Sequence, residues 1–347
     1  PESMPKSTIE DVARLAGVSI KTVSRVVNQE PNVRESTRKS VQKAISQLGY
    51  RPNQSARSLR SRRSYLIGLV YDDPGRYEIP SSGYVVNMQQ GLLTACRAAT
   101  YDLLIHPCNY SSRHIGKELR TLVEHNRLIG VVLAPPLSNM SKITRAIEST
   151  GTPMIRISPG SSRNAANSVV TNDREISAEM TRYLASLGHH RIAFISGHPD
   201  HKAVADRLDG YRDGLKQSTL PASERLIIAG DNSIRAGEEC GARLLDRKMP
   251  PTAIFAANDD MAAGVLRIAH ARGIRVPEDL SVAGFDDIAL AQQVYPRLTT
   301  IKQPLEAMAE RAAELLIEGL NGQPPPATPE MIPARLVIRE STGPAPA

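Results

Sequence analysis

The first 50 residues show apolar positions that recur at the spacing of short amphipathic helices. The spacing predicts three helices, whose apolar faces carry Ile9, Val12, Ala13 and Ala16, then Val23, Val26 and Val27, then Val41, Ala44, Ile45 and Leu48. Thr8 and Asp11 have the spacing of a capping box, Ser19 can cap the second helix, and Gly17 between them suits a tight turn. Because three such helices can share one small core, we expect a helical domain over residues 4–50.

From residue 65 the pattern changes to short apolar runs that alternate with amphipathic stretches. The apolar runs predict strands at 66–71, 102–106, 129–133, 153–157, 168–171, 191–196, 225–229, 252–256, 280–283 and 298–301, with a tail strand near 335–339. The amphipathic stretches predict helices at about 84–99, 114–125, 139–149, 175–187, 203–216, 234–246, 259–272 and 304–320. Such alternation is typical of parallel sheets with helices on both faces. The prediction is therefore an α/β fold, and the strands are too many for one simple sheet, so we divide them between two lobes.

The net charge of +7 is informative once it is located along the chain. Residues 1–63 hold 13 of the 43 Lys and Arg residues but only 5 of the 36 Asp and Glu residues. All of the excess positive charge therefore sits in the first fifth of the chain. This concentration on the predicted helical domain is typical of a surface that binds nucleic-acid phosphates.

Composition excludes several other classes of protein. The 347 residues are 41% hydrophobic, which supports packed cores, yet no apolar run approaches the ~18–20 residues of a membrane span. We find no secretory signal pattern, and the three cysteines are scattered without a CxxC pair. We therefore expect a cytoplasmic, nucleoid-associated protein with no membrane partner, no disulfide framework, no metal and no cofactor.

The second predicted helix has an exposed face that suits DNA. A short helix that presents Lys, Thr, Arg and Asn fits the floor of the major groove, although a pair of ordinary surface helices would show the same periodicity. The letters TIEDVARLAGVS at 8–19, TVSRVVN at 22–28 and ARSLR at 56–60 decide between these alternatives. They resemble the DNA-binding head of the lactose-repressor (LacI/GalR) family, and the resemblance runs along nearly the whole chain.

The resemblance and the exposed face together predict the DNA contacts. Ile20, Lys21 and Arg25 should read base edges, whereas Arg34 and Arg38 should contact phosphate, or else be ordinary solvated residues. The full predicted set is Thr8, Ser19, Ile20, Lys21, Thr22, Ser24, Arg25, Asn28, Arg34, Arg38, Asn53, Ala56, Leu59 and Arg60.

Residues 51–64 form a basic connector that is too short for a stable isolated helix. We expect it to fold when a partner subunit and DNA hold it. Leu59 is its only large apolar side chain, and the resemblance implies a hinge helix whose leucine wedges into the minor groove. The alternative is a flexible linker whose Leu59 packs on the following domain.

The segments LGHHRIAFISG at 187–197 and YPRLTTIKQP at 295–304 resemble the crossover segments of the same family. The fold that this implies for residues 65–347 is that of periplasmic sugar-binding proteins, with two similar lobes joined by three crossings. The predicted boundaries are 65–187 with 304–330 for the first lobe and 188–302 with 331–343 for the second. No heptad segment follows, so we expect a homodimer formed through these lobes.

Polar residues follow many of the predicted strands, where ligands of parallel sheets bind. Carboxylates, an arginine and an amide at one cleft would suit a hydroxyl-rich ligand. The predicted effector contacts are Tyr71, Asp72, Asp73, Arg156, Asp173, Arg207, Asn258 and Asp286. The resemblance supports Arg207 in RLDGYR, Asp286 in SVAGFDD, Asn258 in AIFAANDDMAAGVL and Asp173 in VVTNDREISAEM. The alternative for each aspartate is a helix cap, which we favour for Asp259 and Asp287.

Two departures from the family pattern concern the ligand. Many relatives have an aromatic residue where this chain has Asn232, and the third strand ends in Ala134-Pro135-Pro136 rather than in an amide or arginine. Either the stacking platform is missing or a tyrosine supplies it, and the candidates are Tyr71, Tyr77 and Tyr84. These departures leave the identity of the ligand open.

The sequence therefore predicts a repressor of carbohydrate-utilisation genes that binds operator DNA under the control of a small sugar. The alternatives in the same family are a regulator that needs a purine-like or phosphorylated corepressor, and a dual regulator that responds to a phosphoprotein. A pure ligand-binding receptor is disfavoured by the basic head. A glycoside-acting enzyme is disfavoured because the sequence has no GxSxG, P-loop, GxGxxG or HExxH motif.

Overall fold

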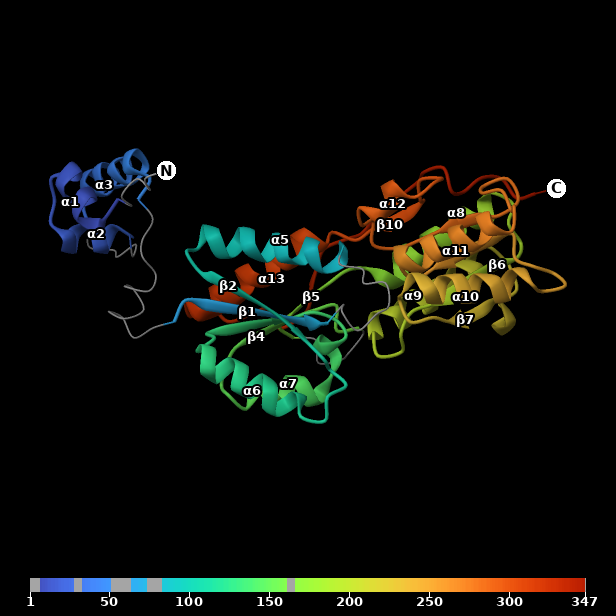
Figure 1. Cartoon of the computed structure of the whole chain (residues 1–347), viewed down its shortest axis with the longest axis horizontal. Coiled ribbons are helices and arrows are strands. Elements are labelled where there is room, and N and C mark those ends of the chain that lie inside the picture. The colour runs from blue at the N-terminus through green and yellow to red at the C-terminus, as the bar shows by residue number, and fades with distance from the viewer. Residues whose placement is uncertain (1–6, 28–32, 51–63, 74–82, 161–165, 347) are drawn as a thin grey trace. The chain divides into compact units, whose positions relative to one another are not determined.

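The computed structural model describes residues 7–27, 33–50, 64–73, 83–160 and 166–346. The chain divides into two compact units, Pro1–Tyr65 and Leu66–Ala347 (Figure 1). No helix in the described part of the chain is long and apolar enough to cross a membrane.

The first unit contains three helices around one small core. They are α1 (Ile9–Ala16), α2 (Ile20–Val27) and α3 (Glu35–Leu48). One residue of each helix, Val12, Val23 and Val41, is fully buried. The predicted capping box is confirmed, because the Thr8 hydroxyl accepts a hydrogen bond from the Asp11 amide while the Asp11 carboxylate accepts one from the Thr8 amide.

Left-handed residues end two of these helices. Gly17 ends α1 with a φ of 66° and Gly49 ends α3 with a φ of 57°. A side chain would be strained in this conformation, which explains a glycine at both positions. The turn after Gly17 leads directly to Ser19, whose hydroxyl accepts a hydrogen bond from the Thr22 amide at 3.1 Å and caps α2 as predicted.

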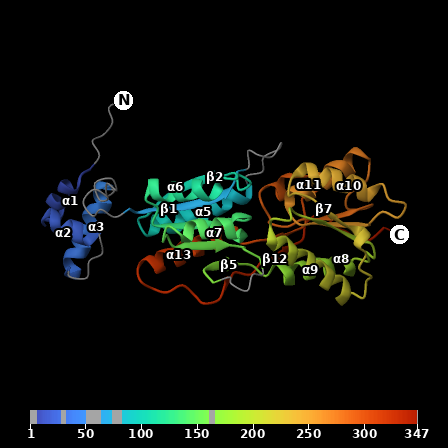
Figure 2. The same cartoon turned by 90° about the horizontal axis from the view of Figure 1, so that it is seen from below.

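The first lobe of the second unit is a six-stranded sheet in the order β11-β5-β4-β3-β1-β2, with parallel neighbours. Its strands are β1 (Leu66–Asp72), β2 (Asp102–Cys108), β3 (Gly130–Leu133), β4 (Met154–Ile157), β5 (Ser168–Val170) and β11 (Glu330–Met331). One face is covered by α5 (Gly83–Ala98) and α13 (Leu305–Leu320), the other by α6 (Ile115–Asn126) and α7 (Ser141–Glu148) (Figures 1 and 2).

The second lobe is a four-stranded parallel sheet in the order β7-β6-β8-β9. Its strands are β6 (Ile192–Ser196), β7 (Ile227–Ala229), β8 (Ala253–Ala256) and β9 (Ser281–Ala283). The helices around it are α8 (Asp173–Ser186), α9 (Lys202–Gln217), α10 (Ile234–Leu245), α11 (Asp259–Ala271) and the short α12 (Leu290–Gln293). In Figure 2, α8 and α9 lie on one side of this sheet and α10 and α11 on the other.

The chain crosses between the lobes after β5, after β10 (Thr300–Lys302), and again before β12 (Arg335–Val337). Strands β10 and β12 pair antiparallel, so the predicted tail strand belongs to a small separate two-stranded sheet. The predicted strands and helices agree with the observed ones within a few residues, but the sequence did not indicate β11 or α12.

The predicted end of the first lobe at residue 187 is wrong. Helix α8 belongs to the second lobe, because Ile176, Met180 and Leu184 pack in the same core as strand β6. These residues lie four positions apart on one helical face, and that face covers the second sheet. The first crossing therefore comes before α8 and not after it.

Candidate effector pocket and DNA-binding head

A buried arginine is at the centre of the second unit's polar cluster. Arg207 extends from α9, and its Nε donates to Asp173 Oδ1 at 2.8 Å while Nη1 donates to the Ala257 carbonyl at 2.6 Å. Nη2 donates to Gln303 Oε1 at 3.4 Å, and the guanidinium carbon lies 3.6 Å from the centre of the Phe285 ring. Burial lowers the pKa of Arg207, but the neighbouring carboxylates outweigh it and raise the pKa overall. The side chain therefore stays charged inside the protein.

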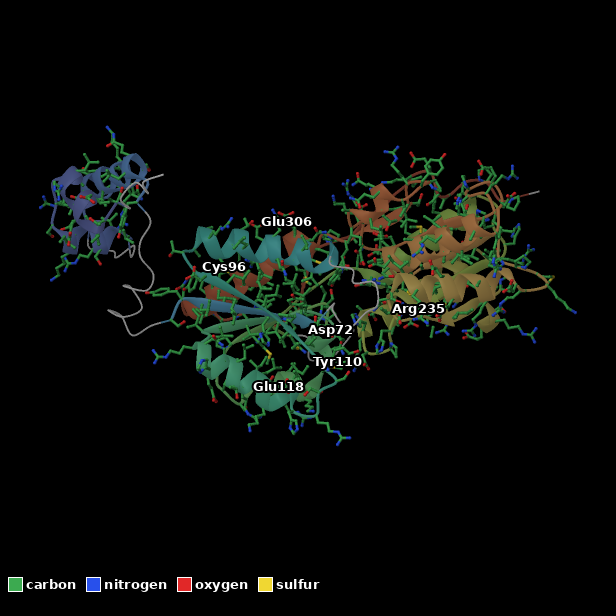
Figure 3. The ribbon with its side chains drawn as sticks, viewed as in Figure 1. Asp72, Cys96, Tyr110, Glu118, Arg235 and Glu306 are labelled. Carbon is green, nitrogen blue, oxygen red and sulfur yellow. The ribbon has the colours of Figure 1, made fainter. Side chains whose placement is uncertain are left out.

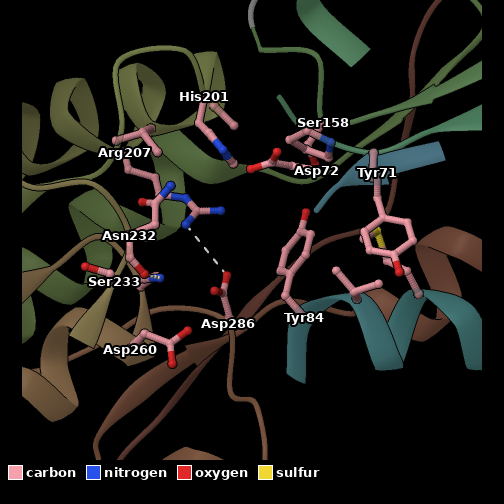
Figure 4. A pocket seen from close by; sticks show the side chains of 17 residues that line it. Tyr71, Asp72, Tyr84, Ser158, His201, Arg207, Asn232, Ser233, Asp260 and Asp286 are labelled. Atoms are coloured by element: carbon pink, nitrogen blue, oxygen red, sulfur yellow. Dashed lines mark hydrogen bonds and ion pairs between the residues drawn. The ribbon is translucent and has the colours of Figure 1, made fainter. Parts of the chain in front are cut away.

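Asp286 faces this arginine from the loop after β9 (Figure 4). Its Oδ1 lies 3.6 Å from Arg207 Nη1, which is an ion pair but too long for a hydrogen bond, and that atom has no hydrogen-bond partner among the described residues. Burial raises the pKa of Asp286 to about 7; Arg207 opposes the rise, whereas Asp260 and Asp173 add to it. A buried carboxylate oxygen is thus available to a ligand.

Both lobes line a cavity of about 140 Å³ next to Arg207. The first lobe contributes Tyr71, Asp72, Tyr84, Val85, Met88, Ala134, Pro135 and Ser158, and the second contributes His201, Ala203, Val204, Arg207, Asn232, Ser233, Asn258, Asp260 and Asp286. Most of these residues come at or just after the carboxyl ends of parallel strands, as Asp72 does at the end of β1 (Figure 3). The cavity therefore lies where open parallel sheets bind ligands.

Two tyrosines supply aromatic surface to the cavity (Figure 4). Burial, with Asp286 in support, raises the pKa of Tyr84 well above its usual value, and burial also raises the pKa of Tyr71. Both phenols are consequently neutral and can donate or accept hydrogen bonds. Of the three tyrosines considered as replacements for the missing aromatic at Asn232, these two line the cavity, while Tyr77 lies outside the described residues.

A neutral histidine borders the cavity at the start of α9. The pKa of His201 is lowered to about 3, first by burial and then by the positive charges of His198 and Arg207. The imidazole is therefore uncharged at neutral pH and offers the cavity one donor and one acceptor.

Asn258 lines the cavity but its amide is used within the protein. Its Oδ1 accepts a hydrogen bond from the Met261 amide at 3.0 Å and caps α11, and its Nδ2 donates to the Asn232 carbonyl at 2.9 Å. Asn258 thereby fixes the loop after β7 against α11. Asn258 therefore has a positioning role, and its predicted contact with the ligand stays a prediction.

The head presents its predicted base-reading residues to solvent. Ile20 is 39% exposed, and Lys21 and Arg25 are also exposed, on the face of α2 opposite Val23 and Val26. The face has the composition of a helix that enters the major groove.

Comparison with known proteins shows to which protein family a chain with these two units belongs. A model of bacterial regulatory proteins of the lacI family matches residues 8–53, and a periplasmic binding protein-like domain matches residues 181–342. The transcriptional regulator GalR of Escherichia coli (strain K12) is 34% identical over 336 residues, covering 96% of this chain and 95% of GalR. The chain belongs to the LacI family.

Solved structures of the family are similar to this chain along nearly its whole length. A complex of the regulator CelR with cellobiose has 30% identity and a TM-score of 0.74, covering 96% of this chain and 99% of CelR. A lac repressor dimer bound to operator and an anti-inducer has 28% identity and a TM-score of 0.72, covering 98% and 100%. This LacI-family protein is therefore a DNA-binding transcriptional regulator with an effector-binding domain, and not an enzyme or a simple receptor.

Three predicted effector contacts of this regulator do not line its cavity. Asp173 lies behind Arg207 and holds it, and Asp73 is absent from the lining. Arg156 donates from Nη2 to the Ala166 carbonyl at 3.0 Å and lines a separate hollow. The other five, Tyr71, Asp72, Arg207, Asn258 and Asp286, do line the cavity, and their contact with an effector stays a prediction.

The predicted capping roles of Asp259 and Asp287 are wrong. Asp259 is fully buried and accepts hydrogen bonds from the Ile288 amide at 2.9 Å and the Thr300 hydroxyl at 2.5 Å, so it braces the loop after β9 against β10. Asp287 pairs with Arg339 at 2.6 Å. The N-cap of α11 is Asn258, and Asp259 is the first residue of the helix.

Several lining residues were missed, notably His201, Ser233 and Asp260. Ser233 caps α10 through a hydrogen bond to the Ala236 amide, a local signal that the sequence does carry. No local sequence pattern distinguishes His201 and Asp260 from their neighbours, because the direction in which each side chain points depends on the residue at which its helix begins.

Some predicted positions remain predictions. Of the predicted DNA contacts, Asn28, Asn53, Ala56, Leu59 and Arg60 lie outside the described residues, and so does the predicted hinge helix. Among the described residues, Arg38 Nε lies 3.9 Å from Glu35 Oε2, and Arg34 directly precedes α3. No group of three or more His, Cys, Asp or Glu residues in the described segments is arranged to hold a metal.

Proposed function

We propose that this regulator represses carbohydrate-utilisation genes and that a small sugar in the cavity sets its affinity for operator DNA. The observation that carries the proposal is the cavity itself, which both lobes line with carboxylate, amide, hydroxyl and aromatic groups. Such groups pair with vicinal hydroxyls and stack on sugar rings. The cellobiose complex of the related CelR supports a sugar as the kind of ligand.

A ligand in this position can act as a switch. It contacts both lobes, so it binds more tightly to one relative arrangement of the lobes and shifts the population toward that arrangement. We propose that the arrangement is transmitted through residues 51–64 to the heads of a homodimer on a near-palindromic operator. By linkage, DNA must then change the affinity for the sugar by the same factor.

On the DNA side we propose that Ile20, Lys21 and Arg25 read base edges and that Leu59 of both subunits wedges into the minor groove. We propose accordingly that the protein acts on operator DNA in the bacterial cytoplasm. The exposure of α2's outer face supports the first part of this proposal.

The experiment is a titration of operator binding by the purified full chain. The probe is a DNA duplex selected in vitro for binding to the protein, and salt is held constant because phosphate contacts make affinity steeply salt-dependent. Mono- and disaccharides, purines and phosphorylated metabolites are added in turn. We expect one sugar to lower the affinity for DNA at least tenfold. If every sugar is inert and a purine or phosphorylated metabolite raises the affinity, the protein is a corepressor-dependent regulator and the sugar proposal is wrong.

A further inference from the structure

An asparagine of the first lobe holds the beginning of α9 in the second lobe. Asn139 ends the short 3₁₀ helix Leu137–Asn139 after β3, and its Nδ2 donates to the Asp200 carbonyl at 2.9 Å. Its Oδ1 accepts a longer hydrogen bond, at 3.5 Å, from the amide of Lys202, the first residue of α9. The amides of a first turn have no partner inside their own helix, and the side chain of the N-cap residue His201 does not accept from this turn of the described helix. Asn139 therefore supplies from one lobe an acceptor that the other lobe's helix lacks.

A glycine of the first lobe makes a second contact with the same turn. Gly160 lies just after β4 with a φ of 78°, and a Cβ built on it would be 2.6 Å from Lys202 Cβ and 3.1 Å from the Lys202 carbonyl carbon. Carbon atoms in contact normally lie about 3.5–4.0 Å apart. Lys202 Cβ is fixed to the backbone and cannot move aside as the tip of a side chain could. The backbone of the first lobe therefore packs directly on the beginning of α9.

These contacts support one wall of the effector cavity. His201 and Ala203 line the cavity (Figure 4), whereas Lys202 between them lines a separate hollow that Asn139 also borders. Asn139 and Gly160 are not among the described residues that line the cavity. They are therefore placed to act on the cavity through α9, without touching its ligand.

We propose that Asn139 and Gly160 form an interlobe clasp on residues 200–203, and that this clasp stabilises the arrangement of the lobes that binds the effector. The inference rests on the proposed function and concerns the regulation of its site. An effector that contacts both lobes and a clasp that joins them favour the same arrangement, so each strengthens the other. When a smaller fraction of the molecules has the binding-competent arrangement, the apparent affinity falls by that fraction. Loss of the clasp therefore weakens effector binding although every contact with the effector is still available.

Asn139→Ala is the first test of the clasp, and Asn126→Ala is its matched control. Asn126 also belongs to the first lobe, and its Nδ2 also donates to a backbone carbonyl at 2.9 Å, that of Leu122 in the same helix. Both changes remove a partly buried hydrogen bond of the same length. The hydrogen bond of Asn139 joins the two lobes, whereas that of Asn126 lies within α6.

Gly160→Ala is the second test, and Gly151→Ala is its matched control. Gly151 also lies in the first lobe and has a φ of 71°, but no atom outside its own neighbourhood lies within 4 Å of a Cβ built on it in the described structure. Both changes place an alanine in a left-handed conformation and strain the backbone alike. The new methyl group of Gly160→Ala also presses on α9, whereas that of Gly151→Ala points into open space.

The experiment is calorimetric titration of the full chain and its four variants without DNA. The probes are glucose, galactose, cellobiose, glucose 6-phosphate, adenine, guanine and hypoxanthine. For every probe that binds the wild type, we expect Asn139→Ala and Gly160→Ala to weaken binding about fivefold or more, and both controls to stay within about twofold. Urea unfolding without a probe measures the stability that each change costs. A merely structural role would lower stability in a test variant and its control alike and would leave affinity unchanged.

The possible failures are distinguishable. If Asn139→Ala binds its probe as tightly as the wild type, the clasp inference is wrong while the sugar proposal stands. The inference is also wrong if each control weakens binding as much as its test variant, because the loss of affinity then follows the loss of stability. If every sugar is inert and a purine or the sugar phosphate binds, the sugar proposal fails and the same ratios judge the clasp with that ligand. If no probe binds and none alters DNA affinity, the proposed function fails, and the inference that rests on it fails too.

Discussion

The head and the effector pocket of this regulator are encoded in different ways. The head's recognition surface comes from one stretch of sequence, and its helices are bounded by the local signals of Thr8, Gly17 and Ser19. The pocket collects side chains from Tyr71 to Asp286, which come together only when both sheets and their crossings have formed. A change in the head should therefore act locally, whereas a change in the pocket should act on the folding of a whole lobe as well as on the ligand.

The largest effect should come from Arg207→Ala, which tests the pocket half of this comparison. The change leaves Asp173 and Asp286 buried without their cation, and removing one partner of a buried pair typically costs about 3–5 kcal/mol. Urea unfolding of the second unit should show this loss, and the response of DNA binding to sugar should disappear. Arg212→Ala on the same helix is the control, since Arg212 is partly exposed and should cost at most about 1 kcal/mol. Equal losses in the two variants would contradict the central role of Arg207.

A second test uses the pKa of Asp286, which burial raises to about 7. The folded protein then holds this proton more tightly than the unfolded chain, whose aspartates titrate near 3.9. The contribution of Asp286 to stability is present at low pH. It is lost as the pH rises from the unfolded pKa to the folded pKa, by on the order of 1 kcal/mol for each pH unit. The Asp286→Asn variant has no such loss. The difference in unfolding free energy between the variant and the wild type should therefore rise from about pH 4 to 7 and then level off. A constant difference across pH, measured by urea unfolding, would show that Asp286 is ionised throughout.

The two regions also explain what the sequence could and could not reveal. Helix periodicity and capping rules locate the head's elements because each rule spans only a few residues. The polarity of strand ends and the family resemblance predict Asp72, Arg207 and Asp286, but they do not tell which of two neighbouring residues faces the cavity. Asn258 caps α11 and also lines the cavity, Asp259 braces a loop, and Asp260 lines the cavity, so three consecutive polar residues have three different surroundings.

The cavity is formed by residues of both lobes, which is a second reason why the sequence did not reveal all of its residues. Asp173 was expected to contact the ligand, but α8 packs in the second lobe and places this carboxylate behind Arg207. His201 gives no sign of function in the sequence because its lowered pKa arises from burial and from the charges of His198 and Arg207. Such roles depend on tertiary packing, which no local pattern contains.

Arg25→Ala tests the head half of the comparison and should have a smaller effect. We expect the loss of discrimination at one base pair of the operator, about 1–3 kcal/mol, with no change in the stability of the second unit. Binding to a set of duplexes that differ at single positions measures this. Arg14→Ala on the exposed side of α1 is the matched removal of a cation. If Arg25→Ala weakens every duplex equally, its role is phosphate contact, and the base-reading assignment is wrong.

The smallest effect should come from Thr8→Ala, which removes the capping box of α1 without touching the face of α2. The change deprives the Asp11 amide of its acceptor and should destabilise the head by about 1 kcal/mol. Thr8 is also among the predicted DNA contacts, so a fall in DNA affinity larger than the unfolded fraction of the head accounts for would indicate a direct contact. Sugar binding to the second unit should not change, since the signal that Thr8 carries is local. A change in sugar affinity, measured by titration without DNA, would show that the head and the pocket are not independently encoded.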